Sequence, residues 1–158
     1  MLAFNARVYD TLLFVHIVAA IAWLGSGLFV QYRGTMLRRR GTPEQMAGLA
    51  KDVADITPWF IVSSITVLVA GIALVLYSPV LGFTDPWILI GLAGYAATFA
   101  TGNFVIRPTV EKLAAAAAAE GPASPTVQAL IARMFAISRV DQVVLVLVVA
   151  DMVFKPGG

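Results

Sequence analysis

The chain has 158 residues, of which 59% are hydrophobic and 13% are charged, and it contains no cysteine. Soluble domains carry about 25% charged residues, so this composition indicates a lipid environment. The missing thiols exclude disulfides, thiolate metal sites and iron–sulfur clusters. The net charge of +2 comes from basic residues in the connections between apolar runs, not along one helical face, and this pattern argues against nucleic acid as a partner.

Four apolar runs are each close in length to the ~20 residues that a bilayer-spanning helix needs. We expect transmembrane helices at residues 11–32, 58–77, 86–106 and 137–154. The first run lacks a signal-peptide cleavage site, so we expect it to stay in the membrane. The sequence therefore predicts an all-α, multi-pass membrane protein in which residues 1–158 form a single four-helix transmembrane bundle.

Three helix starts are predicted where a proline follows an oxygen-bearing residue. The side-chain oxygen can cap the helix, and proline's missing N–H is not needed in a first turn. The three pairs are Thr57-Pro58, Asp85-Pro86 and Ser124-Pro125.

The two long connections are also predicted to contain helix. Residues 42–45 (TPEQ) have the form of a capping box. Residues 111–120 (EKLAAAAAAE) are alanine-rich and are followed by a Gly-Pro stop. A flexible low-complexity linker is the alternative for the alanine run, and its flanking charges favour a solvated helix. The third span is then expected to continue past the membrane.

Basic residues are distributed unevenly between the connections. The connections at residues 33–55 and 107–139 hold many arginines and lysines, whereas residues 78–85 hold none. The positive-inside rule places the two long connections in the cytoplasm. We therefore expect both termini outside the cytoplasm, in a protein of the plasma (inner) membrane whose surroundings are the lipid bilayer.

The first span carries the only histidine of the chain. It belongs to a set of residues that helical spacing places on one face: Tyr9, His16, Trp23 and Gly27. This face is expected to look into the bundle, because a polar side chain is unfavourable against lipid and small residues let helices approach. A similar seam is predicted for the third span at Gly91, Tyr95, Thr98 and Gly102, with a polar path as the alternative interpretation.

The fourth span is interrupted by charge. Asp141 and Asp151 enclose the apolar interval VVLVLVVA, which is roughly 12 Å of helix at 1.5 Å per residue. A membrane core of about 30 Å cannot fit between them. At least one aspartate must lie within the membrane or at its margin, where it needs a partner, water or protonation.

The number of residues from each end of a span gives the approximate membrane depth of its polar residues, and this depth suggests partners for both aspartates. His16 and Asp151 lie near the outer ends of their spans, so a His16–Asp151 pair is feasible. Asp141 has four polar neighbours at similar depth near the inner face: Gln31, Asn103, Arg107 and Arg139. We interpret these residues as an intramembrane polar network that fixes helix geometry. An ion or proton path is the alternative.

No catalytic constellation is apparent in the sequence. It holds no phosphate loop, no recognisable Ser–His–Asp triad, no paired catalytic carboxylates and no HExxH spacing. We therefore lean against an enzyme, and we predict no metal site and no cofactor. Membrane b-type haems commonly use two histidines, and with a single histidine a structural or proton-sensing role is favoured. A haem b held by His16 and shaped by Trp23 is the alternative.

The segments FVHIVAAIAWLGSGLF (residues 14–29) and ADMVFKPGG (residues 150–158) resemble an uncharacterised bacterial family of small predicted integral membrane proteins. This resemblance implies a domain of unknown function with four spans, and no reaction. The first span also resembles HemJ-type protoporphyrinogen oxidases and CopD-type copper-resistance membrane proteins, through His16, Trp23 and Gly27. The HemJ-type resemblance implies b-type haem with His16 as ligand. That group carries a lysine on a later span, which residues 86–104 lack.

Three functional hypotheses follow. The first is a non-enzymatic accessory or interaction component, bound to a membrane protein partner or to a second copy of itself. The second is a haem-associated redox protein. The third is small-solute or ion transfer that uses Asp141 and Asp151.

Overall fold

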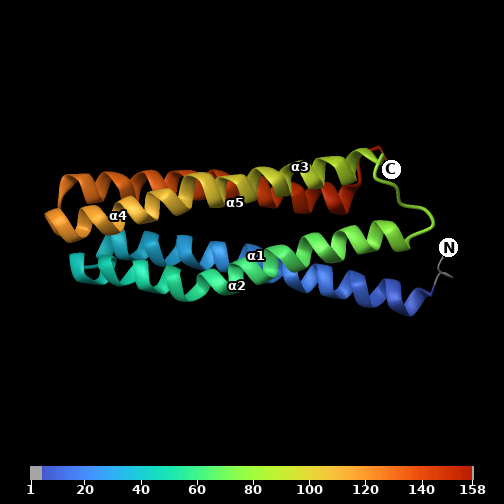
Figure 1. Ribbon diagram of the computed structural model, residues 1–158, viewed down its shortest axis with the longest axis horizontal. Coiled ribbons are helices and arrows are strands. Elements are labelled where there is room, and N and C mark those ends of the chain that lie inside the picture. The colour runs from blue at the N-terminus through green and yellow to red at the C-terminus, as the bar shows by residue number, and fades with distance from the viewer. Residues whose placement is uncertain (1–4, 158) are drawn as a thin grey trace.

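The computed structural model describes residues 5–157, except for the side chains of residues 43, 44, 46, 47 and 50, and within this range it is helical without strands (Figure 1). The all-α prediction is confirmed for these residues. The elements, in chain order, are α1 (Ala6–Arg40), α2 (Pro43–Tyr77), α3 (Pro86–Ala100), the π-helix η1 (Thr101–Ile106), α4 (Arg107–Glu120) and α5 (Pro125–Phe154).

The helices form long rods that lie side by side as two hairpins (Figure 1). α1 and α2 pack along each other in the first hairpin, and the continuous rod of α3, η1 and α4 packs on α5 in the second. The hairpins meet mainly where α1 lies against α5. Both ends of the described chain lie at the same end of the molecule, near the link between α2 and α3.

The rods are longer than a membrane is thick. α1 and α2 have 35 residues each, or roughly 52 Å at 1.5 Å per residue, against a hydrocarbon core of about 30 Å. Among the described residues, three helical segments are long and apolar enough to cross a membrane: Ala6–Arg40, Lys51–Tyr77 and Pro86–Glu120. α5 is not one of them, and Arg139, Asp141 and Asp151 interrupt its apolar run. The predicted fourth span stays a prediction.

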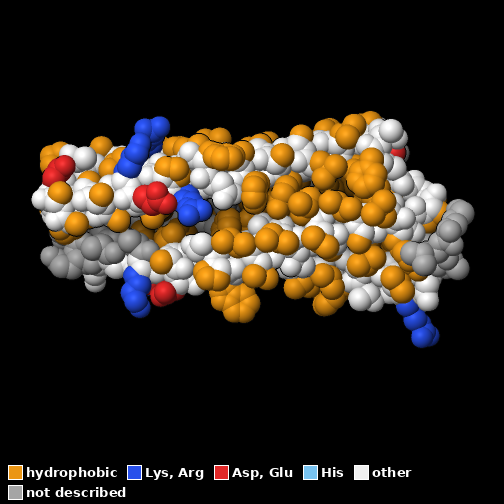
Figure 2. Space-filling view, in the orientation of Figure 1, with side chains coloured by type: hydrophobic (Ala, Val, Ile, Leu, Met, Phe, Trp, Pro, Cys, Tyr) orange, Lys and Arg blue, Asp and Glu red, His pale blue; other side chains and the backbone are white. Residues whose placement is uncertain are grey.

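The surface changes from charged to apolar along the long axis of the molecule. On the face drawn in Figure 2, most charged side chains gather toward the end that α4 and the turn between α1 and α2 form. Apolar side chains cover much of the remaining surface. We call residues 33–57 and 107–136 the basic end, and the rest of the helices the apolar region.

The predicted helix start at Thr57-Pro58 is wrong. α2 begins at Pro43 and runs through Pro58 to Tyr77. The Thr57 hydroxyl donates to the carbonyl oxygen of Val53 at 2.6 Å, one turn back in the same helix, instead of capping a new one. Proline removes one backbone hydrogen bond, which the surrounding α2 tolerates because helix continues on both sides.

The other predicted helix boundaries are confirmed. Thr42 and Gln45 form a reciprocal capping box at the start of α2. Ser124 accepts from the backbone N–H of Val127 and caps α5. Asp85 precedes α3, but its carboxylate accepts from the N–H of Gly82 in the preceding turn. The alanine-rich α4 is helical and stops at Gly121, whose φ of 83° favours glycine.

The third rod continues past its predicted span, as expected, but it contains an unexpected π-helical segment. In η1 the N–H of Arg107 donates to the carbonyl of Gly102, five residues back. The next residue, Pro108, has no N–H to continue the α-helical pattern. The wider π turn therefore lies directly before the proline and joins α3 to α4 without a break.

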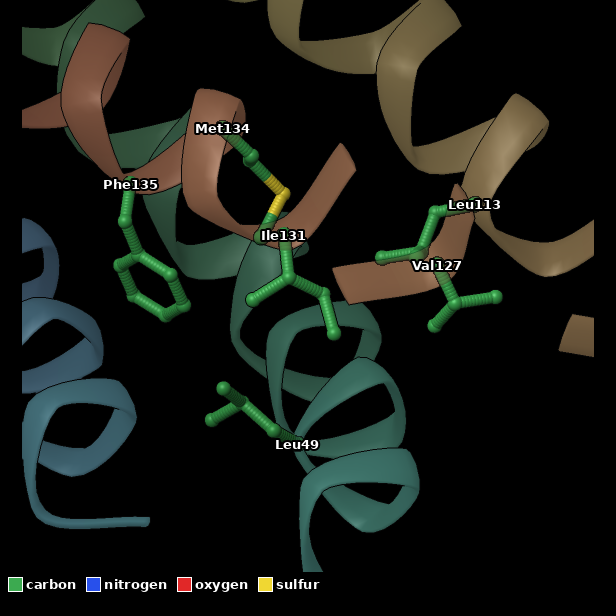
Figure 3. Close-up of a cluster of buried hydrophobic side chains, with 6 residues drawn as sticks. All are labelled: Leu49, Leu113, Val127, Ile131, Met134 and Phe135. Carbon is green, nitrogen blue, oxygen red and sulfur yellow. The ribbon is translucent and has the colours of Figure 1, made fainter. Parts of the chain in front are cut away.

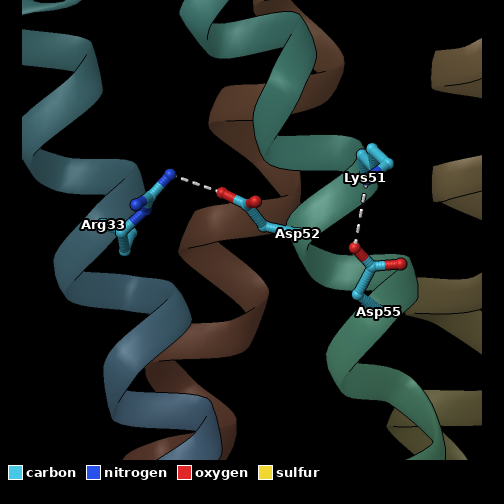
Figure 4. A network of polar contacts seen from close by, with 4 residues as sticks. All are labelled: Arg33, Lys51, Asp52 and Asp55. Atoms are coloured by element: carbon cyan, nitrogen blue, oxygen red, sulfur yellow. Dashed lines mark hydrogen bonds and ion pairs between the residues drawn. The ribbon is translucent and has the colours of Figure 1, made fainter.

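The basic end has a core like that of a soluble protein. Six buried apolar side chains from α2, α4 and α5 point toward one another (Figure 3): Leu49, Leu113, Val127, Ile131, Met134 and Phe135. Its surface carries charge pairs (Figure 4). Arg33 of α1 pairs with Asp52 of α2, and Lys51 pairs with Asp55 one turn away. Apolar burial thus joins the two hairpins outside the apolar region.

Candidate functional site

Two glycines let α1 approach α5 closely. A Cβ atom on Gly27 would overlap the side-chain amide of Gln142, and one on Gly34 would overlap the ring of Phe135. Both pairs are seven residues apart in their helices, so each pair lies on one face. This contact leaves Gln142 buried between α1 and α5.

α3 packs on α5 through a second row of close contacts. A Cβ on Gly91 would overlap the Met152 methyl group, and one on Gly94 would overlap Val148. Farther along the same face, Thr98 lies near the carboxyl group of Asp141. The predicted seam on the third span is thus partly correct, because Gly91 and Thr98 belong to it. No atom of the described residues lies within 4 Å of a Cβ position on Gly102.

The two rows bring four polar side chains from three helices together, and we call these residues the polar cluster: Trp23, Thr98, Asp141 and Gln142. Their exposed fractions are 5%, 3%, 8% and 8%. Trp23 lies one turn before Gly27, against which Gln142 packs. The Trp23 ring also contacts Tyr95 of α3, with ring centroids 5.4 Å apart, and Phe60 of α2 at 6.3 Å.

Three polar atoms of this cluster are buried without a hydrogen-bond partner among the described residues. They are Trp23 Nε1, Thr98 Oγ1 and Gln142 Oε1. The Thr98 hydroxyl lies near the Asp141 carboxyl group, but without an acceptable hydrogen-bond geometry. Unpaired polar groups are unfavourable in an apolar environment by several kcal/mol in model transfer data, of order 2–7. Such groups in a native structure need an explanation.

His16 lies elsewhere, between α1 and α2. Its Nδ1 is 2.9 Å from the carbonyl oxygen of Val67, and its ring packs against Gly71. In the part of the chain that the structure describes, His16 does not pair with Asp151. Asp151 lies against Gly91 of α3, and its Oδ2 has no hydrogen-bond partner there.

The inner polar residues also do not converge on Asp141. Asn103 donates to the carbonyl of Phe99, and Arg139 Nε donates to that of Phe135, each one turn back in its own helix. Arg107 pairs with Glu111, again one turn away. Each of these contacts lies within one helix, and an estimate of membrane depth from the sequence does not reveal it.

Thr98 and Gln142 are the residues of the polar cluster that the sequence did not single out as site residues. The sequence does contain a signal for Gln142. Phe135 and Gln142 share the seven-residue spacing of Gly27 and Gly34, and a pair of small residues opposite a pair of larger ones is typical of a close helix contact. The described residues hold no group of three or more His, Cys, Asp or Glu side chains that could bind a metal ion.

The long apolar rods and the buried polar cluster define a helical integral membrane protein. A family model described as "predicted integral membrane protein (DUF2269)" matches residues 10–156, almost the whole chain, and the chain belongs to this family. No curated protein and no solved structure matches it. The family description gives no reaction, so a function has to be argued from the residues.

Proposed function

We propose that this chain is a four-span protein of the plasma membrane, with both termini outside, that acts as a non-enzymatic interaction component. In this proposal α5 is the fourth span, and its intramembrane polar residues are covered by α1 and α3. The observation that carries the proposal is the set of buried, unpartnered polar atoms of Trp23, Thr98 and Gln142. Polar residues at membrane depth are typically functional.

The three atoms offer a complementary set of hydrogen-bonding roles. The indole Nε1 can only donate, the amide Oε1 can only accept, and the hydroxyl of Thr98 can do both. A group with one donor and one acceptor, such as an amide or a carboxylic acid, has the complementary atoms for the indole N–H and the amide oxygen. Because the three atoms are buried, we propose that α1, α3 and α5 separate locally to admit such a group from a transmembrane helix of a partner membrane protein or of a second copy of this chain.

The test is to measure association in native membranes with Gln142→Met, which keeps the length of the side chain and removes its polar atoms. The matched control is Gln128→Met, because Gln128 is exposed on the same helix. Tagged proteins are extracted in lipid nanodiscs, and copurifying proteins are quantified by mass spectrometry. We expect a partner that is depleted at least tenfold by Gln142→Met and is retained by Gln128→Met.

An equal set of copurifying proteins in both variants would contradict the proposal. A second measurement separates this outcome from misfolding. The thermal unfolding of the isolated variants in detergent should be unchanged or slightly improved, because an unpaired buried polar group contributes no stability. A clear loss of stability in Gln142→Met would instead assign Gln142 to the fold.

A second candidate, haem binding by His16, is favoured by one observation. A ligating histidine commonly donates its other ring N–H to a carbonyl, which fixes the ring. The contact between His16 Nδ1 and the Val67 carbonyl fits this arrangement and leaves Nε2 for a metal. In such a complex a haem would supply redox chemistry, and Val67 would orient the ligand. The test is an oxidised and dithionite-reduced absorption spectrum beside His16→Ala. A Soret band that the variant loses supports haem, and identical featureless spectra oppose it.

A further inference from the structure

A groove lies between α1 and α5 where these helices enter the basic end. Its volume is about 270 Å³, and its lining consists of three arginines and three other residues: Gln31, Thr35, Arg38, Arg39, Phe135 and Arg139. None of the acidic side chains that the structure describes lines it. The groove is therefore a cationic pocket of a size that suits a small anionic group.

The arginines of the groove have no counter-ion among the described residues. The ion pairs of the basic end use Arg33, Lys51 and Arg107 instead. Arg38 and Arg39 lie at the C-terminal end of α1. Their presence there is explained by the positive-inside rule and by the favourable position of cations at a helix C-terminus. They do not explain Arg139, which lies in the middle of α5 and faces the same groove.

The walls of the groove are fixed by contacts between the two helices. The carbonyl oxygen of Phe135 accepts from Gln31 Nε2 at 3.3 Å and from Arg139 Nε at 3.2 Å. The ring of Phe135 fills the space beside Gly34. With Nε engaged, the two terminal nitrogens of Arg139 remain for a ligand, and they can bind two oxygens of a phosphate at once.

Apolar surface continues from the groove toward the other side of the membrane. On α1, Leu28 lies one turn from Gln31 and is 49% exposed. On α5, Val143 and Val146 follow Arg139 at helical spacing and are 58% and 50% exposed. A ligand with a charged head and apolar chains can contact both kinds of surface.

We propose that this groove binds the phosphate group of an anionic phospholipid of the membrane leaflet at the basic end. Arg38, Arg39 and Arg139 bind the phosphate oxygens, and the acyl chains lie along the exposed apolar residues of α1 and α5. Basic pockets between transmembrane helices are known to recognise such head groups. The recognised chemistry is a phosphate anion, which a free phosphate compound also carries. This proposal does not rest on the proposed function.

The test uses the full-length protein in detergent and native mass spectrometry. The probes are phosphatidylglycerol, the zwitterionic phosphatidylcholine, and soluble glycerol 3-phosphate. The variant Arg139→Gln removes the central cation, and Arg133→Gln is its control, because Arg133 is an exposed arginine of α5 that does not line the groove. Thr35→Leu is a second variant that fills the groove and keeps every charge.

We expect phosphatidylglycerol to bind and phosphatidylcholine to bind much more weakly. Arg139→Gln should weaken phosphatidylglycerol binding roughly tenfold, the effect of losing a charge-assisted hydrogen bond. Thr35→Leu should also weaken it, and Arg133→Gln should not. Equal binding of both lipids, or equal effects of the two arginine variants, would overturn the proposal. Binding of glycerol 3-phosphate as tight as that of phosphatidylglycerol would overturn the lipid as the source of the phosphate.

Discussion

The basic end and the apolar region of this molecule use opposite packing rules. In the basic end, apolar side chains such as Ile131 are buried and charges such as those of Arg33 and Asp52 are paired near the surface. In the apolar region, many large apolar residues face outward, and Thr98, Asp141 and Gln142 are buried beside apolar residues such as Leu145. Burial in the first region follows the hydrophobic effect. In the second, lipid is as apolar as the helix interior, and close helix contact depends on small residues.

The largest effect is expected from a substitution that disrupts the core of the basic end. Ile131→Ala removes a side chain that is 6% exposed, and it should lower the free energy of unfolding by about 2–5 kcal/mol. Denaturant titration in detergent, followed by circular dichroism, measures this loss. Val140→Ala on the same helix is the control, because Val140 is 66% exposed. Equal losses in both variants would mean that the basic end is not held by apolar burial.

The next effect tests the glycine contacts of the apolar region. Gly27→Leu should lower the stability by about 1–3 kcal/mol, because the new side chain overlaps the end of Gln142, which is only 8% exposed and has little room to move away. Gly25→Leu should be close to neutral, since nothing lies within 4 Å of a Cβ at that position. Thermal unfolding of both variants in detergent gives the comparison. If the control is as unstable as Gly27→Leu, the contact between α1 and α5 is not specific.

A third prediction sharpens the difference between two buried threonines. Thr109, in the basic end, donates to the carbonyl of Val105 at 2.6 Å, whereas the Thr98 hydroxyl has no hydrogen-bond partner among the described residues. Thr109→Val should therefore lower the stability by about 0.5–1.5 kcal/mol. Thr98→Val should leave it unchanged or raise it slightly. The free energies of unfolding of both variants in detergent test this prediction. A loss of stability in Thr98→Val as large as that in Thr109→Val would show that the Thr98 hydroxyl has a hydrogen-bond partner.

The smallest effect concerns the ion pair that joins α1 to α2. The Arg33 and Asp52 side chains are 45% and 41% exposed, so Arg33→Gln should change the stability by less than about 1 kcal/mol. The difference should shrink further at high salt, because salt screens exposed charges. Unfolding of wild type and variant at low and high salt checks this. A large effect that salt does not alter would contradict it.

Much of the fold was predictable because it depends on local rules. The apolar runs, the capping box at Thr42 and the stop at Gly121 depend on residues near one another in the chain. A cap at Thr57 is suggested by the sequence because a threonine hydroxyl can bond either to the backbone ahead of it or to the carbonyl one turn behind it. In α2 it donates to the carbonyl of Val53, and the helix runs on through Pro58. The polar cluster was only partly predictable. Trp23 and Asp141 stood out by type, but Thr98 and Gln142 depend on which helix faces meet.

The π-helical segment η1 sets the phase of everything that follows it in the third rod. A π turn holds an additional residue compared with an α turn, and each residue of an α-helix advances the side-chain direction by about 100°. If the same residues instead formed regular α-helical turns, every side chain after this segment would be rotated by about 100°. Thr109 and Leu113, both buried in the present arrangement, would then rotate out of the core. The π turn therefore sets the rotation of α4 about the rod axis relative to α3. It lets α3 pack in the apolar region while α4 packs in the basic end.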